Sequence, residues 1–119
     1  WIENAIIEPG GFPTNFFGNL IQPSDHSRNE SYGDFMNVPE QAGAAFGAAV
    51  EANEKQRPER VAEAIVKLVN TESGKRPFRT VVDHMGMGDP ISGYNTQLEE
   101  IMKAIYGNMQ MEGMLETNS

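Results

Sequence analysis

The pattern of apolar and polar positions predicts three helices along this 119-residue chain. Segment 58–70 begins at a proline and carries one wide apolar stripe, and segment 94–112 has apolar residues spaced three and four positions apart. Segment 40–55 follows Pro39, which suits a first helical turn. Its many alanines and glycines indicate a closely packed helix of low intrinsic stability.

Two short apolar runs predict strands. Residues 2–8 contain consecutive apolar side chains, which suits a strand covered on both faces, and residues 77–83 are rich in β-branched side chains. A strand–helix–strand crossover joins the two runs, so they should pair in parallel and the expected fold class is α/β. A two-stranded parallel sheet cannot cover its own faces and edges, so we expect it to belong to a larger sheet.

A long stretch without periodicity follows the first strand. From residue 14 to about residue 38, proline, glycine and polar residues separate a series of aromatic ones. Long irregular segments in compact domains are usually functional loops. We therefore expect residues 14–56, including the helix at 40–55, to form a lid that closes over an apolar ligand.

Composition narrows the classes of partner. Seventeen acidic residues outnumber nine basic ones, and the net charge of −8 repels phosphate backbones and anionic lipid surfaces. We therefore expect no nucleic acid and no membrane as partner. The absence of cysteine rules out thiolate metal sites and fits a reducing compartment, so the expected location is cytoplasmic.

Three sequence features occur in a specific order. The first strand runs into Pro9-Gly10-x-x-x-Thr14, the sequence RPERVAEAIVKLV fills 57–69, and RPFRTVVD fills 76–83. In this order they resemble the C-terminal part of the short-chain dehydrogenase/reductase family, over roughly residues 2–90. The resemblance implies that 1–119 is the C-terminal portion of a Rossmann-like, doubly wound parallel sheet, with two strands, about three helices and a long substrate lid.

The resemblance also implies a cofactor site for NAD or NADP after the first strand. Pro9, Gly10 and Gly11 would belong to this site. The two glycines would let the backbone approach the nicotinamide ring, because they have no side chain to obstruct it. The backbone of Phe12 would bond the carboxamide, and the hydroxyl of Thr14 would contact the same group or the neighbouring phosphate. In open parallel sheets, ligands bind outside the carboxyl ends of the strands, which is where these residues fall.

The implied substrate is a small alcohol or carbonyl compound. The lid residues expected to face it are Phe16, Phe17, Leu20 and Ile21. Members of this family usually form oligomers through the last strand and last helix, so the strand at 77–83 and the apolar face of 98–109 are the expected contacts between subunits.

The catalytic motifs of the family are missing from this sequence. None of the three tyrosines has a lysine four positions on, and no glycine-rich turn follows the first strand in the required pattern. Gly86 and Gly88 come after the last strand instead. We therefore expect a C-terminal fragment that does not catalyse a reaction by itself, and we assign it no catalytic residue.

Simpler interpretations stand beside each site residue. Pro9-Gly10-Gly11 could be an ordinary turn, Thr14 could cap a short helix, and the paired phenylalanines could be core residues. Asp25-His26 and Asp83-His84 are expected at the surface or at a strand end, because no third ligand has suitable spacing for a metal.

Two functions are therefore weighed. The first is an oxidoreductase of the short-chain dehydrogenase/reductase type, of which this chain carries the nicotinamide-side loop and the substrate lid. The alternative is a small acidic interaction module without catalysis.

The fragment interpretation makes a prediction about behaviour in solution. An isolated segment without the other strands of its sheet should expose a large apolar surface. We expect the 119-residue chain to associate, or to bind a hydrophobic dye, in sedimentation and fluorescence measurements. A monomer that unfolds cooperatively and leaves the dye unbound would contradict this interpretation.

Overall fold

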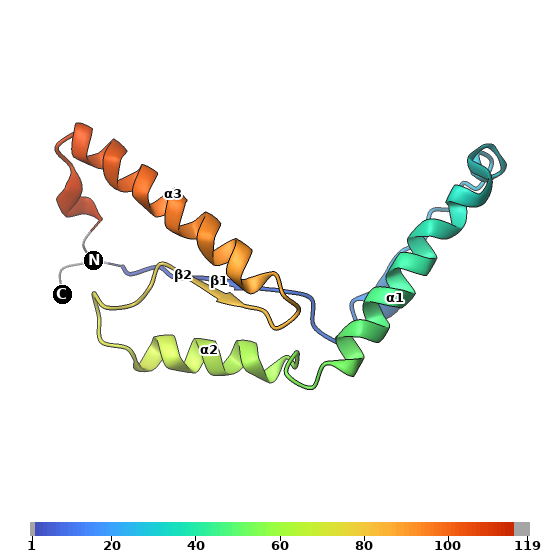
Figure 1. Cartoon of the computed structure of the whole chain (residues 1–119), viewed down its shortest axis with the longest axis horizontal. Coiled ribbons are helices and arrows are strands. Elements are labelled where there is room, and N and C mark those ends of the chain that lie inside the picture. The colour runs from blue at the N-terminus through green and yellow to red at the C-terminus, as the bar shows by residue number, and fades with distance from the viewer. Residues whose placement is uncertain (1, 116–119) are drawn as a thin grey trace.

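The computed structural model describes residues 2–115, which form an α/β arrangement (Figure 1). The strands and α-helices, in chain order, are β1 (Ile6–Pro9), α1 (Val38–Ala52), α2 (Glu59–Asn70), β2 (Arg79–Val82) and α3 (Gly88–Asn108). Short 3₁₀ segments lie at η1 (Phe17–Asn19), η2 (Asn29–Asn37) and η3 (Glu112–Met114).

The two strands pair in parallel, as predicted. Ile6 lies opposite Arg79 and Pro9 opposite Val82. The backbone N–H of Ile6 donates to Phe78 O at 2.7 Å, so the even-numbered residues of β1 direct their backbone groups toward β2. Those of Ile7 and Pro9 face the other edge, and within residues 2–115 no further strand pairs there.

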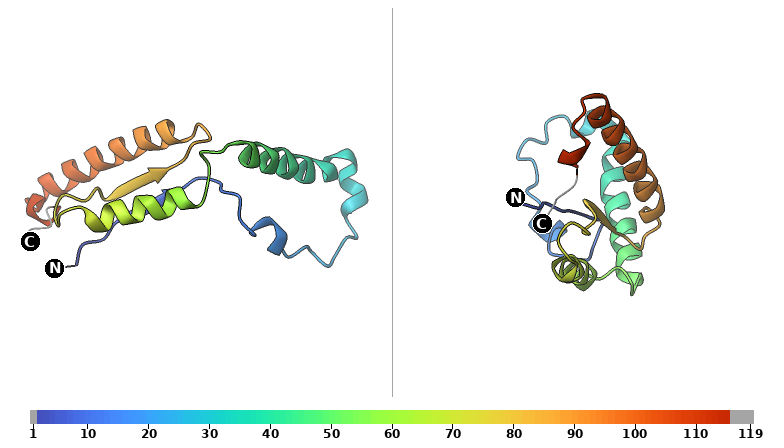
Figure 2. Two further views of the ribbon diagram at one scale, coloured as in Figure 1. Left: turned by 90° about the horizontal axis from the view of Figure 1, so that it is seen from below. Right: turned by 90° about the vertical axis from the view of Figure 1, so that its left-hand side faces the viewer.

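Helices α2 and α3 lie on opposite sides of this strand pair (Figures 1 and 2). The α2 side is apolar, with Leu68 of the helix and Val82 of the strand both buried. Alternation along the strands places Glu8 and Arg79 on the α3 side. There Asn95, only 7% exposed, donates a hydrogen bond from its side chain to the carboxylate of Glu8.

After β1 the chain runs away from the sheet, and helix α1 leads it back toward α2 (Figure 1). The Cα radius of gyration is 20.1 Å, against about 13–14 Å for a compact chain of this length. Within α1 only Val50 is buried, and Phe16, Phe35 and Phe46 are all exposed. The predicted lid is therefore an arm that makes few contacts with the rest of the chain.

Several boundaries differ from those predicted. Helix α3 begins at Gly88 rather than at 94, because the Asp83 carboxylate accepts from the first backbone N–H groups and Pro90 fits the first turn. Both strands are shorter than 2–8 and 77–83. Ile65 and Val69, which belong to the apolar stripe predicted for segment 58–70, are exposed at 46% and 69%.

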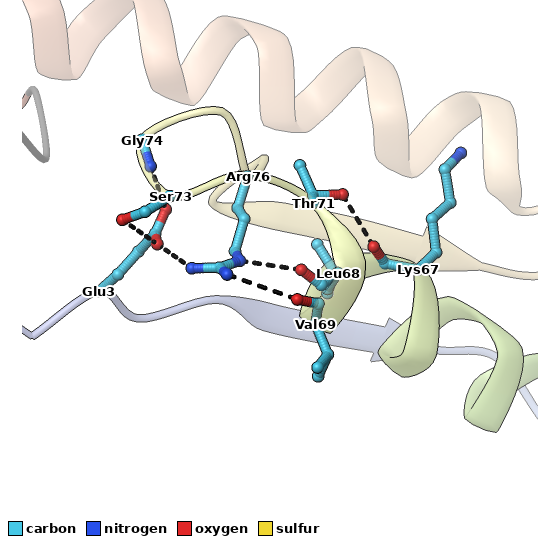
Figure 3. A network of polar contacts seen from close by, with 8 residues as sticks. All are labelled: Glu3, Lys67, Leu68, Val69, Thr71, Ser73, Gly74 and Arg76. Carbon is cyan, nitrogen blue, oxygen red and sulfur yellow. Dashed lines mark hydrogen bonds and ion pairs between the residues drawn. The ribbon is translucent and has the colours of Figure 1, made fainter. Parts of the chain in front are cut away.

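The end of α2 is fixed to the segment before β1 by an ionic network (Figure 3). Arg76 donates to the helix-end carbonyls of Leu68, at 2.8 Å, and of Val69, and it also pairs with the carboxylate of Glu3. Glu3 in turn accepts from the backbone N–H of Gly74 and the hydroxyl of Ser73. The side chain thus satisfies helix-end carbonyls that lack partners within the helix.

This network predicts a local loss of stability in Arg76→Met. The change leaves the Glu3 carboxylate, which is mostly covered, without its cation, and should lower the opening free energy of the Gly74 amide by about 2 kcal/mol in native-state hydrogen exchange. The matched control is Lys75→Met, because Lys75 and Glu72 form a largely exposed pair worth less than about 1 kcal/mol. Equal effects of the two variants would contradict the assigned role.

Candidate functional site

The carboxyl ends of β1 and β2 meet at one edge of the sheet. The last ladder bond runs from the backbone N–H of Gly10 to Val82 O, at 2.9 Å. Beyond it the chain continues as Gly10-Gly11 from one strand and Asp83-His84 from the other. This is where ligands bind in open parallel sheets, because the connections diverge there and leave a crevice.

Asp83 organises the turn that follows β2. One carboxylate oxygen, Oδ2, accepts from the backbone N–H groups of Met85, Met87 and Gly88 at 3.0, 2.8 and 3.1 Å. The turn also requires Gly86, whose φ of 95° lies in the left-handed region. Asp83 is therefore a cap for α3, in keeping with the strand-end role expected for it.

Gly10 and Gly11 are in close contact with their surroundings. A Cβ atom at Gly10 would overlap with Oδ1 of Asp83, and one at Gly11 would overlap with the ring of Phe46. Both positions therefore need glycine for close approach, although neither has a positive φ. The Pro9-Gly10-Gly11 sequence is more than an exposed turn.

An apolar cavity of about 700 Å³ opens beside this tip. Its walls come from the segment after β1, from Phe46 of α1 and from the start of α2. The lining residues are Pro9, Gly10, Gly11, Phe12, Thr14, Phe16, Phe17, Phe46, Pro58, Val61, Ala62 and Ile65.

The predicted site residues are distributed unevenly around this cavity. All five proposed cofactor residues line it, as do the first two of the four lid residues. Phe17 contacts Phe16 and Phe46 edge to face, with ring centroids 5.4 and 6.3 Å apart. Leu20 and Ile21 lie outside, Ile21 being 97% exposed, because the chain becomes extended at Leu20 and leaves the cavity.

Thr14 is exposed, and its hydroxyl makes only a long contact with the chain. Its Oγ1 accepts from the backbone N–H of Phe16 at 3.4 Å. This contact resembles the capping role considered for Thr14, but Thr14 is not the cap residue of η1, which is Phe16. The hydroxyl is accessible to a ligand in the cavity.

The other titratable candidates make local contacts. Asp25 accepts hydrogen bonds from the backbone and hydroxyl of Ser27, which lower the pKa of its carboxyl. His26 contacts the side chain of Asn29, also within the same turn. Among residues 2–115, no three histidine, cysteine or acidic side chains gather in a way that could hold a metal ion.

A second, smaller cavity of about 290 Å³ lies on the α3 side of the strand tips. Glu8, Asp83 and Tyr94 are among its lining residues, together with Asn95. Asn95 already bonds Glu8, and its buried side-chain carbonyl has no partner among residues 2–115. Apolar residues such as Val81 and Ile91 complete the lining of this cavity.

Three residues that shape the site were not predicted as site residues from the sequence. Phe46 forms a wall of the cavity, Asp83 limits the space at Gly10, and Gln56 bonds the strand tips as described below. A carboxylate placed between a strand and a glycine-rich turn is a recognisable capping signal for Asp83. Nothing in the sequence pattern distinguishes Gln56 from the other glutamines.

The chain matches no protein-family model, and it matches none of the curated proteins. Within the described residues, the structure contains no helix with the length and apolarity needed to cross a bilayer.

The close approach at the tip predicts different effects for two glycine substitutions. Gly10→Ala should force Asp83 or the strand tip to move, and protection of the Met85, Met87 and Gly88 amides in hydrogen exchange should fall by about 1–3 kcal/mol. Gly18→Ala is the control, because a Cβ atom there meets no atom within 4 Å. Unchanged protection in Gly10→Ala would show that the tip adjusts freely.

Proposed function

We propose that this chain contributes the nicotinamide-side loop and the substrate lid of an oxidoreductase of the short-chain dehydrogenase/reductase type. In that proposal the loop from Pro9 to Thr14 binds the nicotinamide end of NAD or NADP. The substrate is an alcohol or carbonyl compound held beneath Phe16 and Phe17. The tyrosine and lysine that move the proton come from outside the sequence printed here.

One observation carries the proposal. A glycine pair at which added Cβ atoms would overlap with Asp83 and Phe46 follows a parallel strand, and it opens directly into an apolar cavity of about 700 Å³. A flat heteroaromatic ring needs close backbone approach on one side and apolar cover on the other. The loop provides the first, and the phenylalanines together with the first turns of α2 provide the second.

The unfinished sheet supports the same proposal. The backbone groups of Ile7 face an edge that no strand occupies within residues 2–115, and unpaired edges are normally covered or paired. Exposed apolar residues on α2, such as Val66 and Val69, indicate that this helix packs against further elements. Both features are expected of a portion of a Rossmann-like sheet.

Assembly into an oligomer is part of the proposal. Ile101 and Ile105 of α3 and Met109, the residue that caps its end, form an exposed apolar row at i, i+4 and i+8. We propose that α3 and β2 contact a second subunit through this row and the free edge of β2.

The test is cofactor binding by the complete product of the gene, measured by titration with NADH and with NADPH. We expect one of the two cofactors to bind, and Thr14→Val to weaken its affinity by about fivefold, which corresponds to one hydrogen bond of about 1 kcal/mol. Thr96→Val is the matched control, because that hydroxyl bonds Ser92 O on the surface of α3.

The outcomes separate the two functions under consideration. Binding that is sensitive to Thr14 but not to Thr96 supports the oxidoreductase. Failure of the complete product to bind either cofactor would overturn it and favour the acidic interaction module.

A further inference from the structure

Gln56 is the most completely buried large side chain in the described structure, with an exposed fraction of 0%. It lies in the connection between α1 and α2 rather than in either strand. Its Nε2 donates to Gly11 O at 2.6 Å, and its Oε1 accepts from the backbone N–H of His84 at 2.7 Å. One amide group therefore joins the chain that leaves β1 to the chain that leaves β2.

The connection that carries Gln56 is itself fixed to the same turn. The backbone N–H of Gln56 donates to Asn53 O at 2.9 Å. The side-chain amide of Asn53 donates to His84 O at 2.8 Å and contacts the sulfur of Met85. Both polar backbone groups of His84 are thus bound by this connection, so the side chain of Gln56 is held at its base as well as at its tip.

The group at this position must donate one hydrogen bond and accept another, and an amide does both at any pH. Gly11 offers an acceptor and His84 a donor, so the bridging group needs one of each, held in a single plane. An aliphatic side chain would leave both partly buried backbone groups without these partners, which disfavours the observed arrangement of the two segments. The space is also narrow, since a Cβ atom at Gly10 would lie 3.2 Å from Nε2.

We propose that Gln56 is a positioning residue that sets the orientation of the Gly11 peptide, and with it the cofactor loop from Gly10 to Thr14. This inference rests on the proposed function, because the loop it positions is the proposed nicotinamide site. The side chain is fully covered, so it acts on a cofactor only through the backbone. Cofactor affinity should therefore depend on a residue that the cofactor does not touch.

The experiment uses two variants of Gln56 in the complete gene product, Gln56→Met and Gln56→Glu, and one control. Each is titrated with NADH and with NADPH. Gln56→Met keeps the length of the side chain but removes both hydrogen bonds, and should weaken cofactor affinity at least tenfold. The matched control is Gln97→Glu on the exposed surface of α3, which should bind as the unmodified protein does.

Gln56→Glu adds a dependence on pH that packing alone would not produce. A protonated carboxyl can donate to Gly11 O while accepting from His84 N–H, but an ionised one has no proton for Gly11. Affinity should therefore recover toward that of the unmodified protein as pH falls and decline as pH rises. Burial and the neighbouring carboxylate of Asp83 raise the pKa of the introduced carboxyl, and the His84 N–H acts in the opposite direction.

Other charged groups lie near Gln56, and their effect on the pH dependence is removed by comparing the variants. On its own connection they are Glu54, Lys55 and Arg57, and Arg57 pairs with Glu51 of α1. The His84 side chain adjoins the backbone N–H that Gln56 binds. All of these are shared with Gln97→Glu and the unmodified protein, so the pH dependence is taken as the ratio of affinities to theirs.

The results separate the inference from the function on which it rests. If the unmodified protein binds neither NADH nor NADPH, the proposed function fails. If it binds and Gln56→Met binds equally well, or the affinity ratio of Gln56→Glu is independent of pH, the positioning role is wrong and the function stands. A loss in Gln56→Met together with recovery of Gln56→Glu at low pH supports the inference.

Discussion

The parallel pairing of β1 with β2 is the interaction on which the rest of the structure depends. It brings Pro9 and Val82, which are far apart in the sequence, to the same edge of the sheet. It also creates two faces, one covered by apolar residues of α2 and the other by the polar contacts of Asn95 beneath α3. Each strand has only four residues, so their pairing alone is weak and depends on the helices and side-chain bridges around it.

Those bridges lie at the two ends of the strand pair. At the amino end, Arg76 joins the end of α2 to Glu3, and at the carboxyl end Gln56 joins the two departing segments. The strands are thus held in register by side chains that belong to neither strand. The apolar cavity beside the carboxyl end depends on this arrangement, because Gly11 and Phe46, which approach each other closely, are both among its lining residues.

Sequence periodicity was enough to predict which segments form helices and strands and how the two strands pair. The apolar stripes of α2 and α3 and the apolar run before Pro9 are patterns of nearby residues, and such patterns can be read from a single sequence. The start of α3 was missed because it depends on the Asp83 side chain, which reaches five residues ahead to Gly88. Leu20 and Ile21 were placed in the lid by their apolarity alone, which carries no information about where an irregular chain turns. Gln56 was missed for a related reason, since its importance comes from two backbone groups 45 and 28 positions away.

The free edge of β1 has a consequence for how a larger sheet would be built on it. Along that edge Ile7 offers a backbone donor and an acceptor, whereas Pro9 has no N–H to offer. A neighbouring strand that joins β1 can therefore bond beside Ile7 but finds no donor two residues later. Such a strand would be held less firmly just before the glycines, although the Pro9 carbonyl can still accept a bond. Pro9 thus favours the separation of two adjacent strands next to Gly10 and Gly11.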